Sequence, residues 1–427
     1  MASTYLTRTP GSGQTSRTKG TLSVWLKRAK TDEEDFIFNG FESSSNQIKI
    51  TFRADGKLQI NSVQAGSNHL VYETNRLFRD TSAWYHIVIA IDTTLGTAGD
   101  RCKLYVNGVE ETSFSTETHF SQNDLHYMTE DNRVIYIGSQ QGTANYFDGS
   151  MSHYHLIDGT AYDASAFGET DATTGEWKIK TSPSVTYGNH GFFILKDSGS
   201  VTDQSGNGNN FTVAGGTLTN TEDNPSNVFC TWNPLIPSDL DYANGNTDVQ
   251  QTSNTDWEAT KGTLGFTEGK YYWEVKISSN SGDPWDSFHG IAGENAITSG
   301  ATYDATPSVI FKAGGSIDVD GSNTQSGLGQ SSDGDIIGIA VDADNSNIDF
   351  YRNGTQVGTT QALSSNSGFW LPFSGFAGNR TAQANFGNGY FGTTAVSSAG
   401  TNASGNGIFE YDVPTGYTAL STKGLNL

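Results

Sequence analysis

Hydrophobic and polar residues alternate along many short segments of this chain, and turn residues separate these segments. Residues 21–27 (TLSVWLK) place their leucines and valine at every second position, and residues 48–52 repeat the pattern. Because residues two apart share a face of a β-strand, each segment predicts a strand with one buried face. Residues 85–91 (YHIVIAI) are apolar on both faces, which is typical of a central strand in a covered sheet.

One turn motif appears in both halves of the chain. Asn-Gly follows a strand pattern at 104–108 (LYVNG) and again at 350–354 (FYRNG). A type I′ hairpin turn needs positive φ at both central residues, and Asn-Gly supplies it with little strain. We therefore expect a hairpin with strands at 102–106 and 110–114, and a second one that begins with the strand at 348–352.

Further strand patterns fill both halves, while helical periodicity is missing from the sequence. The best candidate for a short helical piece is 123–132. The other expected strands are 57–60, 134–137, 150–156 and 192–195 in the first half, and 263–266, 271–277, 288–293, 308–312, 336–341, 370–376 and 382–386 in the second. The sequence predicts an all-β fold with little helix, arranged as two tandem jelly-roll β-sandwiches.

The length of 427 residues is too great for one ordinary core and fits two domains. The strand pattern fades into a polar stretch from 158, and residues 233–252 combine two prolines with many small polar residues. We predict a first domain at 1–235, with a polar extension at 158–235, and a second domain at 236–427.

Charge limits the possible partners. The net charge is −22, so the surface repels phosphate and nucleic-acid binding is not expected. No apolar run is long enough to span a membrane, and the N-terminus has no signal-peptide pattern, so synthesis in the cytoplasm is expected. Residues 1–31 carry six lysines and arginines and no acid. They are either a solvated arm that guards an edge strand or an arm that docks on an acidic neighbouring subunit.

The first half resembles the laminin-G-like, concanavalin A-like lectin/glucanase sandwiches over about residues 5–160. The motifs that carry the resemblance are TLSVWLK at 21–27, TSAWYHIV at 81–88, LYVNG at 104–108, and IG at 137–138 with FDG at 147–149. Residues 191–195 (GFFIL) and 203–210 (DQSGNGNN) look like the opening phrase of such a domain. Because they come late in the chain, we expect them to add a strand back to the first sandwich.

The second half resembles SPRY domains over about residues 255–390. The matching motifs are GKYYWEV at 269–275, GDIIGIAVD at 334–342, IDFYRNG at 348–354 and WLP at 370–372. SPRY domains share the jelly-roll superfamily of the first half, and the resemblance implies binding through end loops on a rigid scaffold.

The order of the two modules is similar to that in virion appendage proteins of tailed bacteriophages, particularly marine ones. This resemblance implies a non-enzymatic virion protein: a tail fibre, knob or capsid-surface appendage. Its expected partners are other virion proteins, through the basic N-terminal arm, and host surface carbohydrate, with a homo-oligomeric state. The alternatives are a glycan-degrading enzyme and a purely structural decoration protein.

A glucanase-type enzyme needs paired carboxylates on one strand face. The family pattern Glu-x-Asp-x-x-Glu does not occur in the sequence, and Glu169-Thr-Asp171 lacks the third carboxylate. The acidic run Glu33-Glu34-Asp35 is interpreted as a solvated turn. We therefore predict no catalytic residues.

Metal and cofactor sites are not expected either. Asp342, Asp344 and Asn345 offer oxygens that suit calcium, but a polar hairpin turn fits the same residues better. Residues 318–321, and Asp203 with Asn207, leave the same two alternatives, so calcium remains possible but is not favoured. His153 and His155 would project from one strand face as a transition-metal pair, and without a third ligand a surface strand is favoured.

Aromatic residues provide the one candidate ligand contact. Trp285 lies in a polar loop at 279–287 between two SPRY-like strands, flanked by Asp283 and Asp286. We predict that these three residues contact a ligand; the alternative is that Trp285 folds back and caps the sandwich. The remaining aromatic and thiol predictions are Trp25, Trp84, Trp273 and Trp370 as core residues, and Cys102 and Cys230 as free thiols, buried or half-buried.

Overall fold

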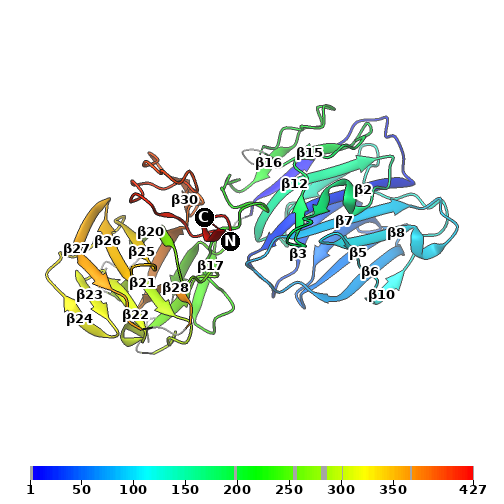
Figure 1. Ribbon diagram of the computed structural model, residues 1–427. Coiled ribbons are helices and arrows are strands. Elements are labelled where there is room, and N and C mark those ends of the chain that lie inside the picture. Colours follow the sequence, from blue (N-terminus) through cyan, green and yellow to red (C-terminus); the bar gives the residue numbers. More distant parts are fainter. Residues whose placement is uncertain are drawn as a thin grey trace. The chain divides into compact units, whose positions relative to one another are not determined.

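The computed structural model describes residues 3–196, 200–252, 257–279, 286–300, 302–365 and 368–426. The chain forms two compact units, Met1–Asn220 and Thr221–Leu427 (Figure 1). This division precedes the predicted domain boundary at 235. Residues after 220 join the second unit because Cys230 and Trp232 are buried in its core, and the Cys230 N–H donates to the Leu420 carbonyl (3.0 Å).

The first unit is a sandwich of an eight-stranded and a six-stranded antiparallel sheet (Figure 1). In spatial order the larger sheet contains β10 (Phe114–Thr118), β6 (Ser67–Leu77), β5 (Lys57–Gln64), β4 (Asn46–Phe52), β3 (Asp35–Ser43), β11 (Val134–Ile137), β1 (Tyr5–Arg8) and β16 (Thr212–Gly215). The smaller contains β15 (Phe192–Ile194), β12 (Gly149–Asp158), β2 (Lys19–Arg28), β7 (Tyr85–Asp92), β8 (Cys102–Val106) and β9 (Val109–Glu110). A small hairpin of β13 (Gly168–Thr170) and β14 (Trp177–Ile179) and two 3₁₀ turns, η1 (Ala98–Asp100) and η2 (Ala164–Ala166), complete the unit.

The core of this unit follows from the alternation in the sequence. Leu22, Val24 and Leu26 of β2 face Ile48 and other apolar side chains of the larger sheet, and all four are fully buried. Each such side chain stabilises the fold by about 1.5–3 kcal/mol relative to exposure. The late segment also returns to this sandwich as predicted, since β15 pairs with β12 and β16 pairs with β1.

The second unit is another antiparallel sandwich. Its larger sheet contains β17 (Leu240–Ala243), β18 (Asp248–Gln251), β29 (Arg380–Asn385), β20 (Lys270–Ser279), β25 (Ile336–Asp342), β26 (Asn347–Arg352) and β27 (Thr355–Ala362), with β32 (Thr418–Ala419) parallel to β20. Its smaller sheet contains β19 (Glu258–Lys261), β28 (Trp370–Phe376), β21 (Ser287–Gly293), β22 (Ser308–Lys312), β23 (Ser316–Val319) and β24 (Ser322–Gln325). A hairpin of β30 (Tyr390–Phe391) and β31 (Thr394–Ala395) and the 3₁₀ turns η4 (Thr302–Asp304) and η5 (Gly424–Asn426) complete it.

The all-β prediction is confirmed, and the helical segments within the described ranges are three residues long. None of them is long and apolar enough to cross a membrane. The predicted core tryptophans are also confirmed: Trp25, Trp84, Trp273 and Trp370 are all less than 10% exposed, at 4%, 7%, 0% and 6%. Cys102 and Cys230 are buried thiols, one in each unit.

Both predicted Asn-Gly turns are present and adopt positive φ, with values of 48° and 80° at Asn107-Gly108 and 51° and 75° at Asn353-Gly354. In each turn the Asn side chain also accepts a hydrogen bond from a backbone N–H in the first two residues of the neighbouring strand. Asn107 accepts from His86 (2.7 Å), and Asn353 accepts from Ile336 (2.9 Å). The motif therefore fixes the register of the adjacent strand as well as the turn.

Three element predictions are wrong. The expected strand at 110–114 is interrupted at 111–113, where the chain leaves β9 in one sheet and enters β10 in the other. Residues 263–266 form no strand, although Phe266 bridges to Trp370. Residues 123–132 contain no helix and form a loop on the first unit.

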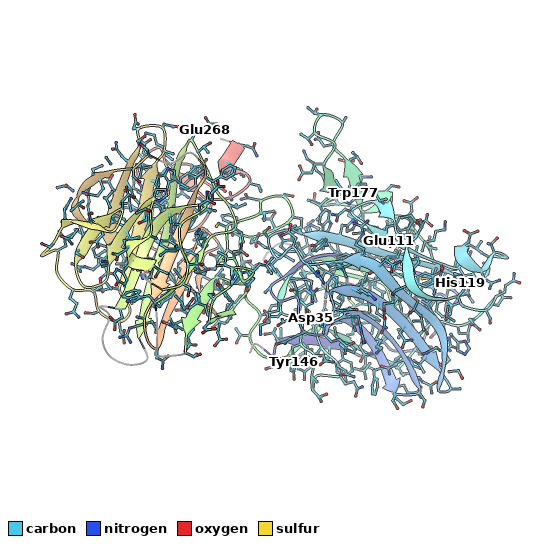
Figure 2. The ribbon with its side chains drawn as sticks, turned by 90° about the horizontal axis from the view of Figure 1, so that it is seen from below. Asp35, Glu111, His119, Tyr146, Trp177 and Glu268 are labelled. Atoms are coloured by element: carbon cyan, nitrogen blue, oxygen red, sulfur yellow. The ribbon has the colours of Figure 1, made fainter. Side chains whose placement is uncertain are left out.

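A segment that follows each sandwich covers the outer face of one of its sheets. In the first unit, Phe167, Trp177 and Tyr187 of the predicted polar extension pack over Val88 and Ile157 on the six-stranded sheet. Figure 2 places Trp177 on the hairpin of β13 and β14. In the second unit, residues 386–426 cover β20 and β25, and we call them the C-terminal segment; Phe409, Val413 and Ala419 pack there against Tyr272 and Ala340.

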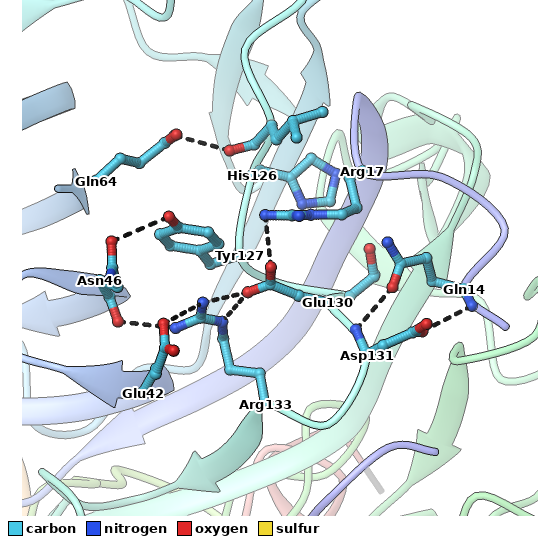
Figure 3. A network of polar contacts seen from close by, with 12 residues as sticks. Gln14, Arg17, Glu42, Asn46, Gln64, His126, Tyr127, Glu130, Asp131 and Arg133 are labelled. Atoms are coloured by element: carbon cyan, nitrogen blue, oxygen red, sulfur yellow. Dashed lines mark hydrogen bonds and ion pairs between the residues drawn. The ribbon is translucent and has the colours of Figure 1, made fainter. Parts of the chain in front are cut away.

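The basic N-terminal residues are engaged within the first unit. Arg17 pairs with Glu130 (2.7 Å), and the Arg133 guanidinium lies 3.8 Å from the Tyr127 ring centroid and bonds Glu130 and Glu42 (Figure 3). This network holds the 120–133 loop against the sheet. The other described partners of these cations are Asp92 for Lys19 (2.9 Å), Asp35 for Arg28 (3.0 Å), Asn209 for Arg8, and Glu33 and Asp148 for Lys30.

The expectation of a solvated turn at Glu33-Glu34-Asp35 is wrong for Asp35. This residue begins β3, is 1% exposed, and pairs with the fully buried Arg28. Arg28 also donates to the Phe78 carbonyl (2.9 Å) and lies over the Phe52 ring (4.5 Å). Asp35 is therefore a structural partner inside the sandwich.

Candidate functional site

The predicted ligand loop is only partly described. Asp283 and Trp285 lie outside the described residues. Asp286 is at the end of the loop, where its side chain is 49% exposed and lies 3.7 Å from the Arg380 guanidinium. The Asp286 carbonyl also accepts the Ala377 N–H (2.8 Å), which attaches this end of the loop to the turn between β28 and β29.

Just beyond Asp286, β21 carries an aromatic surface that we call the Trp257 patch, formed by Trp257, Phe288, Tyr303 and Lys312. The Trp257 ring stacks on Phe288, with centroids 5.6 Å apart and an interplanar angle of 18°. Tyr303 meets Trp257 edge to face at 5.2 Å. Trp257, Tyr303 and Lys312 are half-buried, whereas Phe288 is fully buried beneath them.

The Trp257 patch stands on a rigid base. Ala259, Ile310 and Phe373 lie on the same outer face of the smaller sheet and are fully buried with Phe288. The adjacent loop at 294–300 is held by Lys261, whose ammonium donates to the carbonyls of Glu294 (2.6 Å) and Ala296 (2.7 Å). Burial lowers the pKa of Lys261, although these two carbonyls solvate its charge.

Polar groups border the aromatic rings. The Lys312 ammonium lies 5.2 Å from the Tyr303 centroid and pairs with Asp318, which is almost fully buried. Asp318 also accepts a hydrogen bond from the Asn323 amide (3.0 Å). A half-buried indole near an ammonium group that a buried carboxylate fixes in place can stack on a sugar ring, while the ammonium binds a sugar hydroxyl. The sequence alone did not predict Trp257 as a binding residue, because it is a single aromatic residue in a polar segment before a strand.

The structure brings a serine and a histidine together in the first unit, which sequence spacing did not reveal. Ser23 Oγ lies 2.9 Å from His86 Nε2, across the paired strands β2 and β7. The Trp177 indole N–H donates to His86 Nδ1 (2.9 Å), so Nδ1 is the unprotonated nitrogen and Nε2 carries the hydrogen. This is the wrong tautomer to accept a proton from Ser23. Burial lowers the pKa of His86 to about 3, so the ring is neutral.

His153 and His155 do project from one side of β12, with ring centroids 6.5 Å apart. His153 occupies a bulge with φ 48°, and His155 is buried, stacked on Phe193 at 3.9 Å and hydrogen-bonded to the Tyr187 hydroxyl (2.9 Å). The expectation of a surface strand face is wrong for His155, because the extension covers it. Across the described ranges, no group of three or more His, Cys, Asp or Glu side chains could hold a metal ion.

The calcium candidates act as turn residues. Asp342 accepts the backbone and side-chain N–H groups of Asn345 (3.0 and 2.8 Å) and pairs with Lys270 (2.7 Å). Asp344 accepts the Gly269 N–H (2.8 Å). Asp203 accepts the N–H groups of Phe193, Ser205 and Asn209 and shapes the 203–210 turn in the same way.

A buried carboxylate holds the C-terminal segment on the second unit. Glu274 of β20 is fully buried and accepts the backbone N–H groups of Glu410 and Tyr411, both at 2.9 Å. The Tyr272 hydroxyl (3.2 Å) and the Asn385 amide (3.3 Å) also bond it. Burial raises the pKa of Glu274 to about 7 against the opposing effect of these donors. Its four partners are structural, which leaves no open face for a substrate at this carboxylate.

Comparisons with known proteins match both halves of the chain. The model for the concanavalin A-like lectin/glucanases superfamily matches residues 2–166. The model for the SPRY domain matches residues 270–389. No curated protein matches the chain.

Solved structures similar to part of this chain include several SPRY domains. The crystal structure of the SPRY domain of human HERC1 is 18% identical, with a TM-score of 0.32, and the match covers 36% of this chain and 96% of that one. A human SPRY domain is 18% identical, with a TM-score of 0.28, covering 34% and 94%. The stonustoxin structure is 19% identical, with a TM-score of 0.29, covering 36% and 27%.

Proposed function

We propose that this chain, in which a concanavalin A-like domain is followed by a SPRY domain, is a non-enzymatic attachment protein. Both domain types are generally binding modules. The observation that carries the proposal is the Trp257 patch, where a half-buried indole and a fixed Lys312–Asp318 pair share one rigid sheet face. We assign host surface glycans to this patch as ligands.

The finer proposal is that the protein is a bacteriophage virion component: a tail fibre, knob or capsid-surface appendage. It rests on the order of the two modules, which is similar to that in such appendage proteins. In this role the chain contacts host surface glycans or neighbouring virion subunits.

The contacts of the buried polar groups support binding rather than hydrolysis. The Ser23–His86 pair has the wrong tautomer for a nucleophile and its base. Burial raises the pKa values of Asp35 and Glu274 to about 7. Asp35 forms an ion pair with Arg28, and Glu274 accepts hydrogen bonds from backbone N–H groups. Asp148 is a second carboxylate near Asp35, but Asp35 is 1% exposed and held by the buried Arg28, whereas glycoside hydrolysis requires a pair of carboxylates that both reach the substrate.

A glycan array of bacterial surface polysaccharides, probed with the full chain and with Trp257→Ala, tests the assignment. We expect glycan binding that weakens about fivefold or more in the variant, because stacking of a ring on an aromatic side chain contributes on the order of 1–3 kcal/mol. Phe369→Ala is the matched control, since Phe369 is an aromatic residue of the same unit with 52% exposure.

Two array results would contradict the assignment. Equal binding by Trp257→Ala and the parent chain would show that the patch is not the site. No glycan binding, together with tight co-purification with virus particles, would favour a purely structural decoration protein.

A further inference from the structure

One sheet edge of the first unit is open and uncharged. β16 ends the eight-stranded sheet and pairs with β1 through Tyr5–Gly215, Leu6–Val213 and Thr7–Thr212, with a register shift between Tyr5 and Leu6. Thr212, Val213 and Ala214 are exposed, with Val213 at 37%. Within the described part of the chain, no strand pairs with the other side of β16, so its outward N–H and C=O groups have no ladder partner there.

The other three sheet edges of this unit are protected. β9 is only two residues long. β10 has a register shift between Phe114 and Thr116 and carries Glu117. β15 is covered by the next segment, because Gln204 N–H donates to the Phe193 carbonyl (2.8 Å). β16 is also short, and its register against β1 shifts between Tyr5 and Leu6. It differs from these edges because residues 212–215 carry no charge and, within the described ranges, no further strand pairs with it.

The sequence around β16 is uncharged in an otherwise acidic chain. Residues 204–221 contain no Asp, Glu, Lys or Arg, although the net charge of the chain is −22. When a strand pairs with its own copy about a two-fold axis, every charge near the axis faces a like charge. A neutral edge is therefore what pairing between two identical acidic chains requires.

Three tyrosines form a group near this edge: Tyr5 on β1, Tyr136 on β11 (the next strand inward), and Tyr146 in the loop after β11. The Tyr5 ring crosses Gly215 of β16 so closely that a Cβ there would collide with it. Tyr136 and Tyr146 lie 6.4 and 6.1 Å from Tyr5, and all three rings are half-buried. Tyr146, labelled in Figure 2, is held by a hydrogen bond from its hydroxyl to the Gly142 carbonyl (2.9 Å). Half-exposed rigid tyrosines are typical anchors of protein interfaces.

We propose that β16 pairs antiparallel with the same strand of a second copy of this chain, forming a sheet that continues across the dimer. Tyr5, Tyr136 and Tyr146 pack against the partner beside the paired strands. This self-association goes beyond the attachment function and does not depend on whether the Trp257 patch binds a glycan.

Sedimentation velocity of the full chain over a concentration series tests the pairing. We expect a reversible dimer whose association constant falls about tenfold or more in Ala214→Lys and in Thr212→Lys, because like charges would meet across the new ladder. Thr118→Lys on the protected edge strand β10 is the matched control and should dimerise like the parent chain. The thermal midpoint of each variant verifies that it is folded.

Three results would overturn the proposal. The first is a parent chain that stays monomeric at its highest soluble concentration. This includes the case in which the monomer binds a different virion protein along β16. The second is an undiminished dimer in both β16 variants. The third is a dimer that Thr118→Lys disrupts as strongly as Ala214→Lys.

Discussion

At the scale of single residues, the glycines of the two Asn-Gly turns have a role that turn geometry alone does not explain. In each unit an aromatic ring from the covering segment lies against the glycine: Trp177 against Gly108 and Tyr411 against Gly354. Each aromatic residue also makes a hydrogen bond beneath it, from the Trp177 indole to His86 and from the Tyr411 N–H to Glu274. The turn motif therefore provides a docking point for the segment that follows the sandwich.

Gly108→Ala is expected to destabilise the first unit by about 2–4 kcal/mol, because it combines a strained positive φ with a collision against Trp177. Gly175→Ala is the matched control. Gly175 has a similar φ of +75° with nothing within 4 Å of an added Cβ, so we expect a loss of about 1 kcal/mol. Urea unfolding of the two variants measures the difference. Equal losses would show that Trp177 does not rest on the turn.

At the scale of elements, alternation identified most of the strands that form the cores. The patterns at 21–27, 85–91 and 271–277 correspond to β2, β7 and β20, since one or both of their faces are buried. The expected strand at 110–114 failed because alternation does not reveal that a chain changes sheets at 111–113. β3 and β6 were missed because glycine, asparagine and charged residues interrupt their patterns.

The candidate sites were harder to predict because they depend on contacts between distant segments. The Ser23–His86–Trp177 group joins three segments of the first unit, and only the register of β2 and β7 brings the first two together. Trp257 is a binding candidate because of Phe288 and Tyr303, which neighbour it only in the fold. The polar composition of the extension also concealed Phe167 and Tyr187, which cover a whole sheet face.

The C-terminal segment gives the second unit a specific pH dependence. The folded pKa of Glu274 is about 7, above its free value of 4.5, so folding is favoured by protonation. This contribution is fully present below the free pKa and is lost as the pH rises through 7. We expect the free energy of unfolding of the parent chain to rise when the pH is lowered from 8 to 5. This rise should exceed that of Glu274→Gln by about 2–3 kcal/mol.

Pulsed proteolysis in urea, with fragments of residues 221–427 followed by mass spectrometry, measures this difference for the second unit. Glu268→Gln is the control, because Glu268 is an exposed carboxylate of the same unit (Figure 2). A Glu274→Gln variant with the same pH dependence as the parent would contradict the assigned role of the buried carboxylate.

At the scale of the whole molecule, each unit holds a buried acid in structural contacts, Asp35 with Arg28 and Glu274 with backbone N–H groups, and presents a different kind of surface. The second unit offers the Trp257 patch, and the first offers the open edge of β16 with its three tyrosines. Because the chain is strongly acidic, we expect it to repel nucleic acid, and we propose that its specific contacts form at these two less charged surfaces. This division suits an attachment protein that both self-associates and binds a ligand.

Incubation of the purified full chain with bacterial surface polysaccharides, followed by measurement of bound protein and of polysaccharide chain length, tests the central claim of binding without catalysis. We predict that the protein is retained on a polysaccharide whose length distribution stays unchanged after prolonged incubation. Progressive shortening of the chains would contradict the account, because cleavage of glycosidic bonds requires a pair of catalytic carboxylates.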